Sequence, residues 1–316
     1  MAITGYVYSK RYLDHETCPG HPERPDRLRV IHRRLVFSGL INDLKVIDPY
    51  PASIDRIARL HDRDYIEGFQ RACQEGQQVL GEADNSICAN SFEVARLAVG
   101  GVFAACDALM RGEVDNAFCA VRPPGHHAER AQAMGFCYFG NVALGAKYLQ
   151  EQHGLERIAI VDWDAHHGNG TQHLLEEDPT VLYISLHEDP RVCFPGTGLK
   201  LERGKGAGEG YTLNFPFPPH TRGPAYVEVM DEEVLPALEQ FRPDCLMISA
   251  GFDAHMNDPM AHLHLSHRGY MILGALLLSF ARDFCQGRVI SVLEGGYNLE
   301  ALEDCVFNHV RALKSM

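Results

Sequence analysis

Short runs of apolar residues alternate with longer stretches of helical periodicity along this chain of 316 residues. The runs contain many β-branched residues and almost no polar ones, which is typical of strands buried on both faces of a parallel sheet. They predict strands at residues 2–8, 117–121, 158–162, 182–186, 245–249 and 289–293. Apolar positions three and four residues apart predict helices at 91–110, 142–152, 226–240, 268–283 and 299–314. Alternating strands and helices indicate an α/β fold.

The pattern has no internal repeat and no linker rich in proline, glycine or serine. Length alone fits either one large domain or two of ordinary size. Because nothing divides the chain, we predict a single domain over residues 1–316.

Net charge and cysteine content limit which binding partners and which cellular compartment can be expected. Lys and Arg number 29 against 42 Asp and Glu, and the net charge of -13 argues against nucleic acid or an anionic membrane as partner. No apolar run reaches the roughly 18 residues that span a bilayer, and the first residues lack the basic start of a signal peptide. The ten cysteines form no C-x-x-C pair. We therefore expect a cytoplasmic protein with free thiols, and the sequence leaves oligomerisation open.

Polar, glycine-rich sequence motifs, called words below, follow the apolar runs. They are RPPGHHA at 122–128, DWDAHHGNG at 162–170, HEDPRVCFPGTG at 187–198, GFDAHMNDP at 251–259 and EGGYN at 294–298. Ligands of open parallel sheets bind beyond the carboxyl ends of the strands. We expect these five words to meet in one site.

The word after residue 161 offers two metal ligands. Asp164 and His166 are two residues apart on an extended segment, so their side chains can point the same way. Asp253, after another strand, can supply a third ligand. Three protein ligands with an open position are typical of catalytic zinc, and Fe²⁺ is the alternative for this ligand mixture.

Three further histidines lie close together in the sequence, at His262, His264 and His267. No acid accompanies them. We expect them to be loop and helix-start residues rather than metal ligands.

Acid and base chemistry is expected from the adjacent His126 and His127. Two partners of different charge are available for them, the carboxylate of Asp162 and the neutral amide of Asn169. A general base has to be neutral near pH 7, so the histidine that pairs with Asn169 is the better base. Spacing alone leaves the pairing open. Tyr297, on a turn after two glycines, can donate a hydrogen bond to a developing oxyanion.

Taken together, these words resemble a known motif series. RPPGHHA, MGFCYFGN, VDWDAHHGNG, SLHEDPRVCFPGTG, SAGFDAHMNDP and LEGGYN are similar to the motifs of the zinc-dependent histone deacetylases, including their bacterial deacetylase-like and acetylpolyamine amidohydrolase relatives. The resemblance runs from about Tyr12 to Tyr297. It is closest to the class II branch, because Asn169 stands where class I enzymes carry an aspartate.

The resemblance implies a single-domain, arginase-like fold with an eight-stranded parallel sheet flanked by helices. It also implies a pairing of the histidines. His127, oriented by Asn169, is implied to be the general base and later the acid. His126, paired with Asp162, is implied to be an electrostatic stabiliser.

Substrate-binding residues follow from the same resemblance. Phe136 in GFCYF and Phe194 in CFPGTG match the two aromatic walls of an acyl-lysine tunnel. Gly135, Met260 and Gly295, which flanks the catalytic tyrosine, are also expected to bind the substrate. Met260 stands where the polyamine-specific relatives carry a glutamate gatekeeper, which weakens a polyamine assignment.

The family pattern also implies structural K⁺. Its site would be built from Asp162, Asp164, His166, Ser185 and Leu186.

The expected reaction is removal of an acetyl or other acyl group from acetyl-lysine or a related acetylated aliphatic amine. The carboxylates of Glu188 and Asp189 are expected near the tunnel mouth, where they would favour a positively charged substrate. Gly140 replaces the usual asparagine of GFCFFNN, with an effect that the sequence does not predict. An acetylpolyamine deacetylase is the first alternative.

Two other functions fit less well. An arginase-type ureohydrolase needs D-A-H-x-D for a second metal, and Gly168 occupies the last position of that pattern, while His255 stands where another acid would be wanted. A catalytically inactive acyl-binding module would not need the complete set of candidate catalytic residues.

Overall fold

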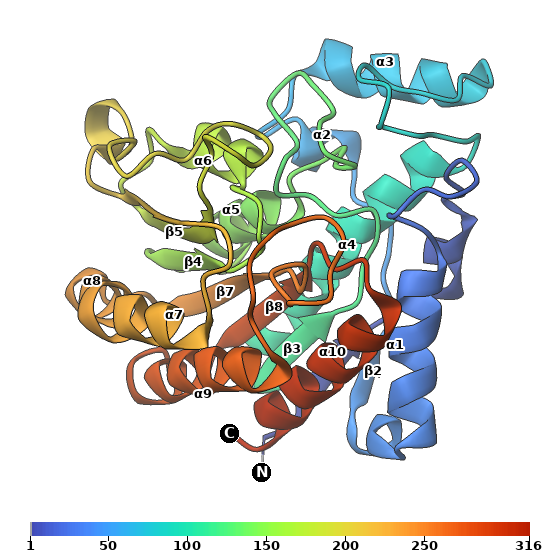
Figure 1. Ribbon diagram of the computed structural model, residues 1–316. Coiled ribbons are helices and arrows are strands. Elements are labelled where there is room, and N and C mark those ends of the chain that lie inside the picture. Colours follow the sequence, from blue (N-terminus) through green and yellow to red (C-terminus); the bar gives the residue numbers. More distant parts are fainter. Residues whose placement is uncertain (1) are drawn as a thin grey trace.

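The computed structural model, described for residues 2–316, is built around one parallel sheet (Figure 1). The strands are β1 Thr4–Val7, β2 Lys45–Ile47, β3 Asn116–Cys119, β4 Ile158–Asp162, β5 Val181–Glu188, β6 Thr212–Phe217, β7 Cys245–Ala250 and β8 Val289–Leu293. Their order is β2-β1-β3-β8-β7-β4-β5-β6, and all pairs are parallel. The implied eight-stranded parallel sheet is therefore confirmed.

The six strands expected from apolar runs are those near the middle of the sheet and their neighbours. The pattern missed β2 and β6, which are the two edge strands. β2 has only three residues, two of them exposed, and β6 contains Pro216. Edge strands need less apolar surface and tolerate proline, so they lack the signal that marks a buried strand.

Helices cover both faces of the sheet. Their bounds are α1 Asp26–Phe37, α2 Ile54–Ile57, α3 Arg63–Gln74, α4 Ser91–Met110, α5 Asn141–His153, α6 Asn169–Leu175, α7 Gly223–Val229, α8 Leu235–Phe241, α9 His267–Phe284 and α10 Leu299–Lys314. α1, α10 and α9 pack side by side in a row, and α4 packs on α5 (Figure 1). The expected bounds of α4 and α10 are confirmed.

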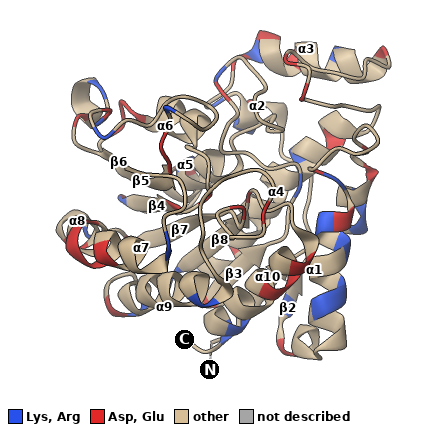
Figure 2. Ribbon diagram, viewed as in Figure 1, with Lys and Arg blue, Asp and Glu red and all other residues tan. Residues whose placement is uncertain are grey.

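The helix expected at 226–240 is wrong in one respect. α7 and α8 are joined by a π-helical turn over Met230–Val234, so the segment is not one regular α-helix. Pro236 near the start of α8 lacks an N–H to continue the regular ladder. The ribbon is coloured red at acidic residues in the region of α8 and blue at basic residues of α1 in Figure 2.

The basic residues of α1 do not form a free patch. Arg29 pairs with Asp26, while Arg33 and Arg34 pair with Glu303 and Asp304 of α10. These exposed pairs contribute little stability individually, but they neutralise the helix surface.

Two further expectations concern the whole chain. All ten cysteines are free, as predicted. No helix within residues 2–316 is long and apolar enough to cross a membrane.

Candidate active site

The sheet register brings the polar words together. Asp162, at the end of β4, lies beside Ser185 of β5 and Ser249 of β7, and Ala250 of β7 lies beside Leu293 of β8. The segments that leave these strands emerge at the same edge of the sheet. The loops after β4, β7 and β8 therefore meet there.

Three side chains from these loops form a buried cluster. His166 Nδ1 lies 3.2 Å from Asp164 Oδ1 and 3.0 Å from Asp253 Oδ2. One ligand atom of each residue lies within 4.8 Å of the others. The cluster brings together the three residues that the sequence singled out as metal ligands.

Hydrogen bonds from the surrounding backbone orient these ligands. His166 Nε2 donates to the Met260 carbonyl at 3.2 Å, which leaves Nδ1 as the nitrogen that faces the carboxylates. Gly295 N donates to Asp164 Oδ2 at 2.8 Å, and Ala165 N donates to Asp253 Oδ1 at 2.8 Å. Such partners fix the tautomer and direction of a metal ligand.

The negative charge of the two buried carboxylates favours a bound cation in the cluster. Burial lowers the pKa of His166, but the carboxylates of Asp164 and Asp253 outweigh it and raise that pKa well above its ordinary value. Burial and the neighbouring Asp164 raise the pKa of Asp253 to about 7. Positive charge between the two buried carboxylates therefore stabilises their ionised forms. One nitrogen and two carboxylate donors suit zinc or Fe²⁺, so the residues fit a divalent metal.

A second group of side chains also has the composition of a metal site, namely His255, His267 and Cys305. Asn257 N donates to His255 Nδ1 at 3.2 Å, so the ring proton of a neutral His255 is on Nε2. Nε2 lies 3.3 Å from His267 Nδ1 and can donate to it. This hydrogen bond accounts for the close approach of the two histidines, and we assign no metal to them.

The two adjacent histidines of the β3 loop have different partners. His126 Nδ1 lies 3.1 Å from Asp162 Oδ2, which also accepts from the Tyr183 hydroxyl at 3.0 Å. Burial lowers the pKa of His126, but Asp164 and Asp162 outweigh it and raise that pKa to about 10. The carboxylate of Asp162 beside the ring thus favours the cationic form of His126.

His127 has the opposite character. Its Nδ1 lies 2.7 Å from Asn169 Oδ1, and Asn169 Nδ2 donates to Glu129. This contact sets the amide orientation, so that Asn169 accepts the ring proton and Nε2 of His127 is left unprotonated. Burial, with the neighbouring charge of His126, holds the pKa of His127 well below its ordinary value. The structure has the pairing that the family resemblance implied.

Tyr297 lies on a turn that is held from several sides. Asp258 Oδ2 accepts from Tyr297 N at 2.7 Å, and the Arg27 guanidinium lies 5.0 Å from the ring centroid. Phe136 meets the ring edge to face, with centroids 5.9 Å apart. These contacts fix the ring at the site.

Phe194, one of the two aromatic residues expected to bind the substrate, packs beside His127 and His166. The Phe194 ring meets His127 edge to face, with centroids 5.0 Å apart. Gly135, at φ 53°, leaves no room for a side chain, since a Cβ there would lie 2.4 Å from His127 Cδ2 and 2.9 Å from Phe194 Cε1. A Cβ at Gly295 would lie 2.3 Å from Asp253 Oδ2. Both glycines are required by close packing around the site.

The expectation of a carboxylate that is free to bind a cationic substrate is wrong for Glu188. Glu188 is buried, and its side chain accepts from His262 N at 3.0 Å. Asp189 is engaged in a two-oxygen contact with Arg191. Glu188 is therefore not available to a cationic substrate, whereas Asp189 forms an ion pair with an exposed arginine.

The remaining predicted positions have definite surroundings. Gly140 N donates to His61 Nε2 at 2.9 Å, and a Cβ there would lie 2.8 Å from Leu174 Cδ1. The glycine thus fits a close approach of α5 to α6. His262 and His264 lie in a loop and His267 begins α9, as expected.

Several acidic residues around the site were not predicted. The Glu23 carboxylate accepts two hydrogen bonds from Arg122, one of 2.7 Å from Nε and one of 2.6 Å from Nη2. Glu129 orients Asn169, and Glu294 binds the backbone of the histidine loop. The cue available for Glu23 and Glu294 was an acid inside an otherwise apolar or motif-like segment.

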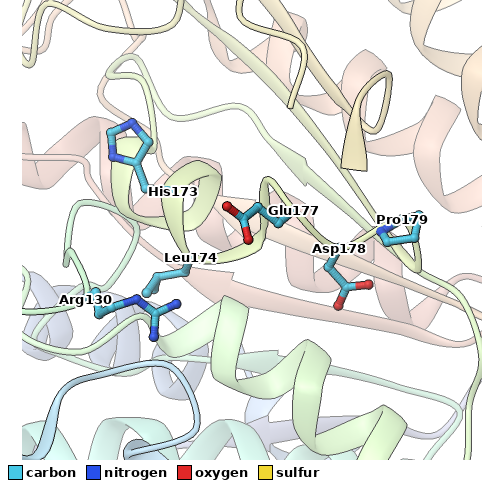
Figure 3. A pocket seen from close by; sticks show the side chains of 6 residues that line it. All are labelled: Arg130, His173, Leu174, Glu177, Asp178 and Pro179. Atoms are coloured by element: carbon cyan, nitrogen blue, oxygen red, sulfur yellow. The ribbon is translucent and has the colours of Figure 1, made fainter. Parts of the chain in front are cut away.

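A surface pocket lies on the outer side of α6 (Figure 3). It is lined by Arg130, His173, Leu174, Glu177, Asp178 and Pro179. His173 contacts Glu129, but none of the three cluster residues lines the pocket. The candidate chemistry is therefore located at the cluster and not in this pocket.

The fold and this site define a class of α/β proteins in which loops at the carboxyl ends of parallel strands hold one imidazole, two carboxylates and a histidine pair. Residues 21–313 match the histone deacetylase domain. The chain belongs to the histone deacetylase family.

Similar proteins occur in archaea, bacteria and eukaryotes. A probable deacetylase of Archaeoglobus fulgidus is 41% identical, over 94% of this chain and 82% of its own length. A histone deacetylase-like amidohydrolase of Pseudomonas aeruginosa is also 41% identical, over 88% of this chain and 73% of its own. The solved structure of the HDA15 HD domain is 34% identical to this chain and superposes with a TM-score of 0.93. The match covers 100% of this chain and 90% of the HDA15 chain.

Proposed function

We propose that this protein is a zinc-dependent amidohydrolase that removes an acetyl group from acetyl-lysine or a related acetylated aliphatic amine. One observation carries the proposal. The cluster of Asp164, His166 and Asp253 lies in the same site as His127, whose Nε2 is unprotonated. Membership of the histone deacetylase family supports a hydrolase acting on amide bonds.

Asp164, His166 and Asp253 would hold the metal. When bound, zinc supplies a Lewis acid for the scissile carbonyl and lowers the pKa of water. His127 Nε2 accepts the proton of the attacking water, because Asn169 keeps the other ring nitrogen protonated. The same nitrogen then gives a proton to the leaving amine, so acetate and a free amine are the products.

The charges around the reacting carbon change during this step. His126, cationic beside Asp162, stabilises negative charge that develops on the substrate. Tyr297 donates its hydroxyl proton in a hydrogen bond to the substrate oxyanion. Burial raises the pKa of Tyr297 well above its ordinary value, so the hydroxyl stays protonated as this role requires.

Phe136 and Phe194 would flank the aliphatic chain of the substrate. A slender methylene chain fits between aromatic faces better than a branched group. The burial of Glu188 removes one acid that could bind a polyamine, which favours an acetyl-lysine-like substrate over the polyamine alternative.

A two-metal ureohydrolase is disfavoured by Gly168. A Cβ there would lie 2.4 Å from the Tyr183 hydroxyl and 2.5 Å from Asp162 Oδ2, so an aspartate has no space. His255 points to His267 instead of supplying a carboxylate.

We also propose structural K⁺ near the backbone of Asp162, Asp164 and His166. Ser185 is the register partner of Asp162, which places Ser185 and Leu186 beside that segment. Loss of stability on replacing K⁺ with a larger organic cation would support this ion.

Acetate release from acetyl-lysine peptides and acetylpolyamines, with and without a chelator, tests the proposal. Peptide turnover should fall to background with the chelator and return with Zn²⁺ or Fe²⁺. Asp253→Asn should lose metal and turnover together, whereas Asp283→Asn, at an exposed acid of α9, should keep both. Turnover that resists the chelator would overturn the metal mechanism.

A further inference from the structure

The turn that carries Tyr297 also carries a buried carboxylate that the reaction does not use. Glu294 is fully buried, and it immediately follows β8. Its Oε2 accepts from Gly125 N at 2.7 Å and from His126 N at 3.1 Å. A single side chain from the tyrosine turn thus binds two successive amides of the histidine loop.

This contact spans the two halves of the catalytic apparatus. The histidine pair follows β3 and the tyrosine turn follows β8, and the two segments lie 169 residues apart in sequence. Gly125 offers no side chain for packing, and a Cβ there would lie 2.5 Å from Asn141 N. The loop is therefore held at this point by backbone contacts, and two of its donors go to Glu294.

The other side of the turn is fixed as well. Arg27 Nε donates to the Gly296 carbonyl at 2.7 Å, and its Nη2 donates to the Glu294 carbonyl. Asp164 Oδ2 receives Gly295 N. Glu294 is thus a rigidly mounted acceptor, because the backbone on which it sits is bound by Arg27 and by a metal-binding residue.

The second oxygen of Glu294 is unusual. Within residues 2–316, Oε1 is buried and has no hydrogen-bond partner. A buried oxygen without a partner is costly, so a side chain selected for packing alone would not be a carboxylate. The two amides bound by Oε2 are the contacts that account for an acid here.

We propose that Glu294 is a positioning residue, which sets the distance between the His126–His127 loop and the Tyr297 turn through its accepted hydrogen bonds. The inference rests on the proposed function, since it concerns the placement of the proposed base and oxyanion donor. Misplacement of reacting groups by about 1 Å can cost about 100-fold in rate.

Two variants separate hydrogen bonding from charge and packing. Glu294→Gln keeps an oxygen that can accept from both amides, and we expect its kcat to stay within about threefold of the parent enzyme. Glu294→Met fills a similar volume without a strong acceptor, and we expect kcat to fall by about 10- to 100-fold with little change in KM. Glu300→Met, at an exposed position of α10, is the matched control and should leave both constants unchanged.

A measurement independent of turnover accompanies the kinetics. Amide hydrogen exchange of Gly125 and His126 should speed up in Glu294→Met and not in Glu294→Gln. Equal kcat and equal exchange in the parent and Glu294→Met would overturn the positioning role, as would equal losses in both variants. An inactive parent enzyme with the expected exchange pattern would instead count against the proposed function.

Discussion

Glu23→Gln is the most quantitative test of how the site is supported. The Glu23 carboxylate binds Arg122 through two bonds and lies 3.3 Å from Arg27, and all three side chains are fully buried. Arg122 begins the segment that carries the histidine pair, and Arg27 binds the tyrosine turn. Removing the charge of Glu23 therefore leaves two buried cations without their counter-ion.

The magnitude follows from the pKa of Glu23. Burial raises this pKa, but Arg122 and Arg27 outweigh burial and lower it from 4.5 to about 2. A depression of this size is worth about 3 kcal/mol of folding free energy. The value agrees with the roughly 3–5 kcal/mol measured when one partner of a buried ion pair is removed. Because the folded pKa is depressed, this stability is present above pH 4.5 and is lost as pH falls toward 2.

Urea unfolding followed by circular dichroism tests both parts. At pH 7 the urea midpoint of Glu23→Gln should fall by an amount equal to about 3 kcal/mol, with an unchanged m-value. The variant should also lose less stability than the parent between pH 4.5 and pH 2. Glu16→Gln, at an exposed position, should stay within about 0.5 kcal/mol. A Glu23→Gln variant as stable as this control would refute the reasoning.

Three other changes probe the site directly. Tyr297→Phe should keep its metal, measured by elemental analysis, while kcat drops about 100- to 1000-fold; normal turnover would remove its proposed role. Asn169→Asp should raise the pKa of His127, so the acidic limb of kcat/KM moves to higher pH, and an unmoved limb would contradict the pairing argument. Gly295→Ala forces a Cβ against Asp253 and should weaken metal retention against a competing chelator by about 10-fold or more, whereas Gly68→Ala in α3 should not.

The sequence predicted the central strands and the long helices because their apolar periodicity is strong. α4 and α10 were predicted with the bounds that the structure has. α1 and α3 were not predicted, although α3 has apolar residues at Ile66, Phe69 and Cys73 with helical spacing. Many charged residues on the outer faces of these helices dilute that signal. β2 and β6 could not be recognised, because edge strands lack a continuous apolar run.

The site was predictable where its chemistry follows the strand ends. Asp164 and His166 come two residues apart, directly after a buried strand, and this spacing is visible in the sequence. The partner of each histidine was not, since His127 and Asn169 meet only through the fold. Glu294 was missed for the same reason, as its partners belong to a loop on another strand.

The strand order has a consequence for how the molecule is made. β8, the last strand in the sequence, lies between β3 and β7 at the middle of the sheet. Until residues 289–293 are in place, the strands form two separate half-sheets, and each has an open edge toward the other. A growing chain therefore exposes two templates for wrong pairing until most of it has been synthesised. Insertion of one five-residue strand closes both edges and brings Tyr297 to the histidine pair, so folding and acquisition of activity coincide.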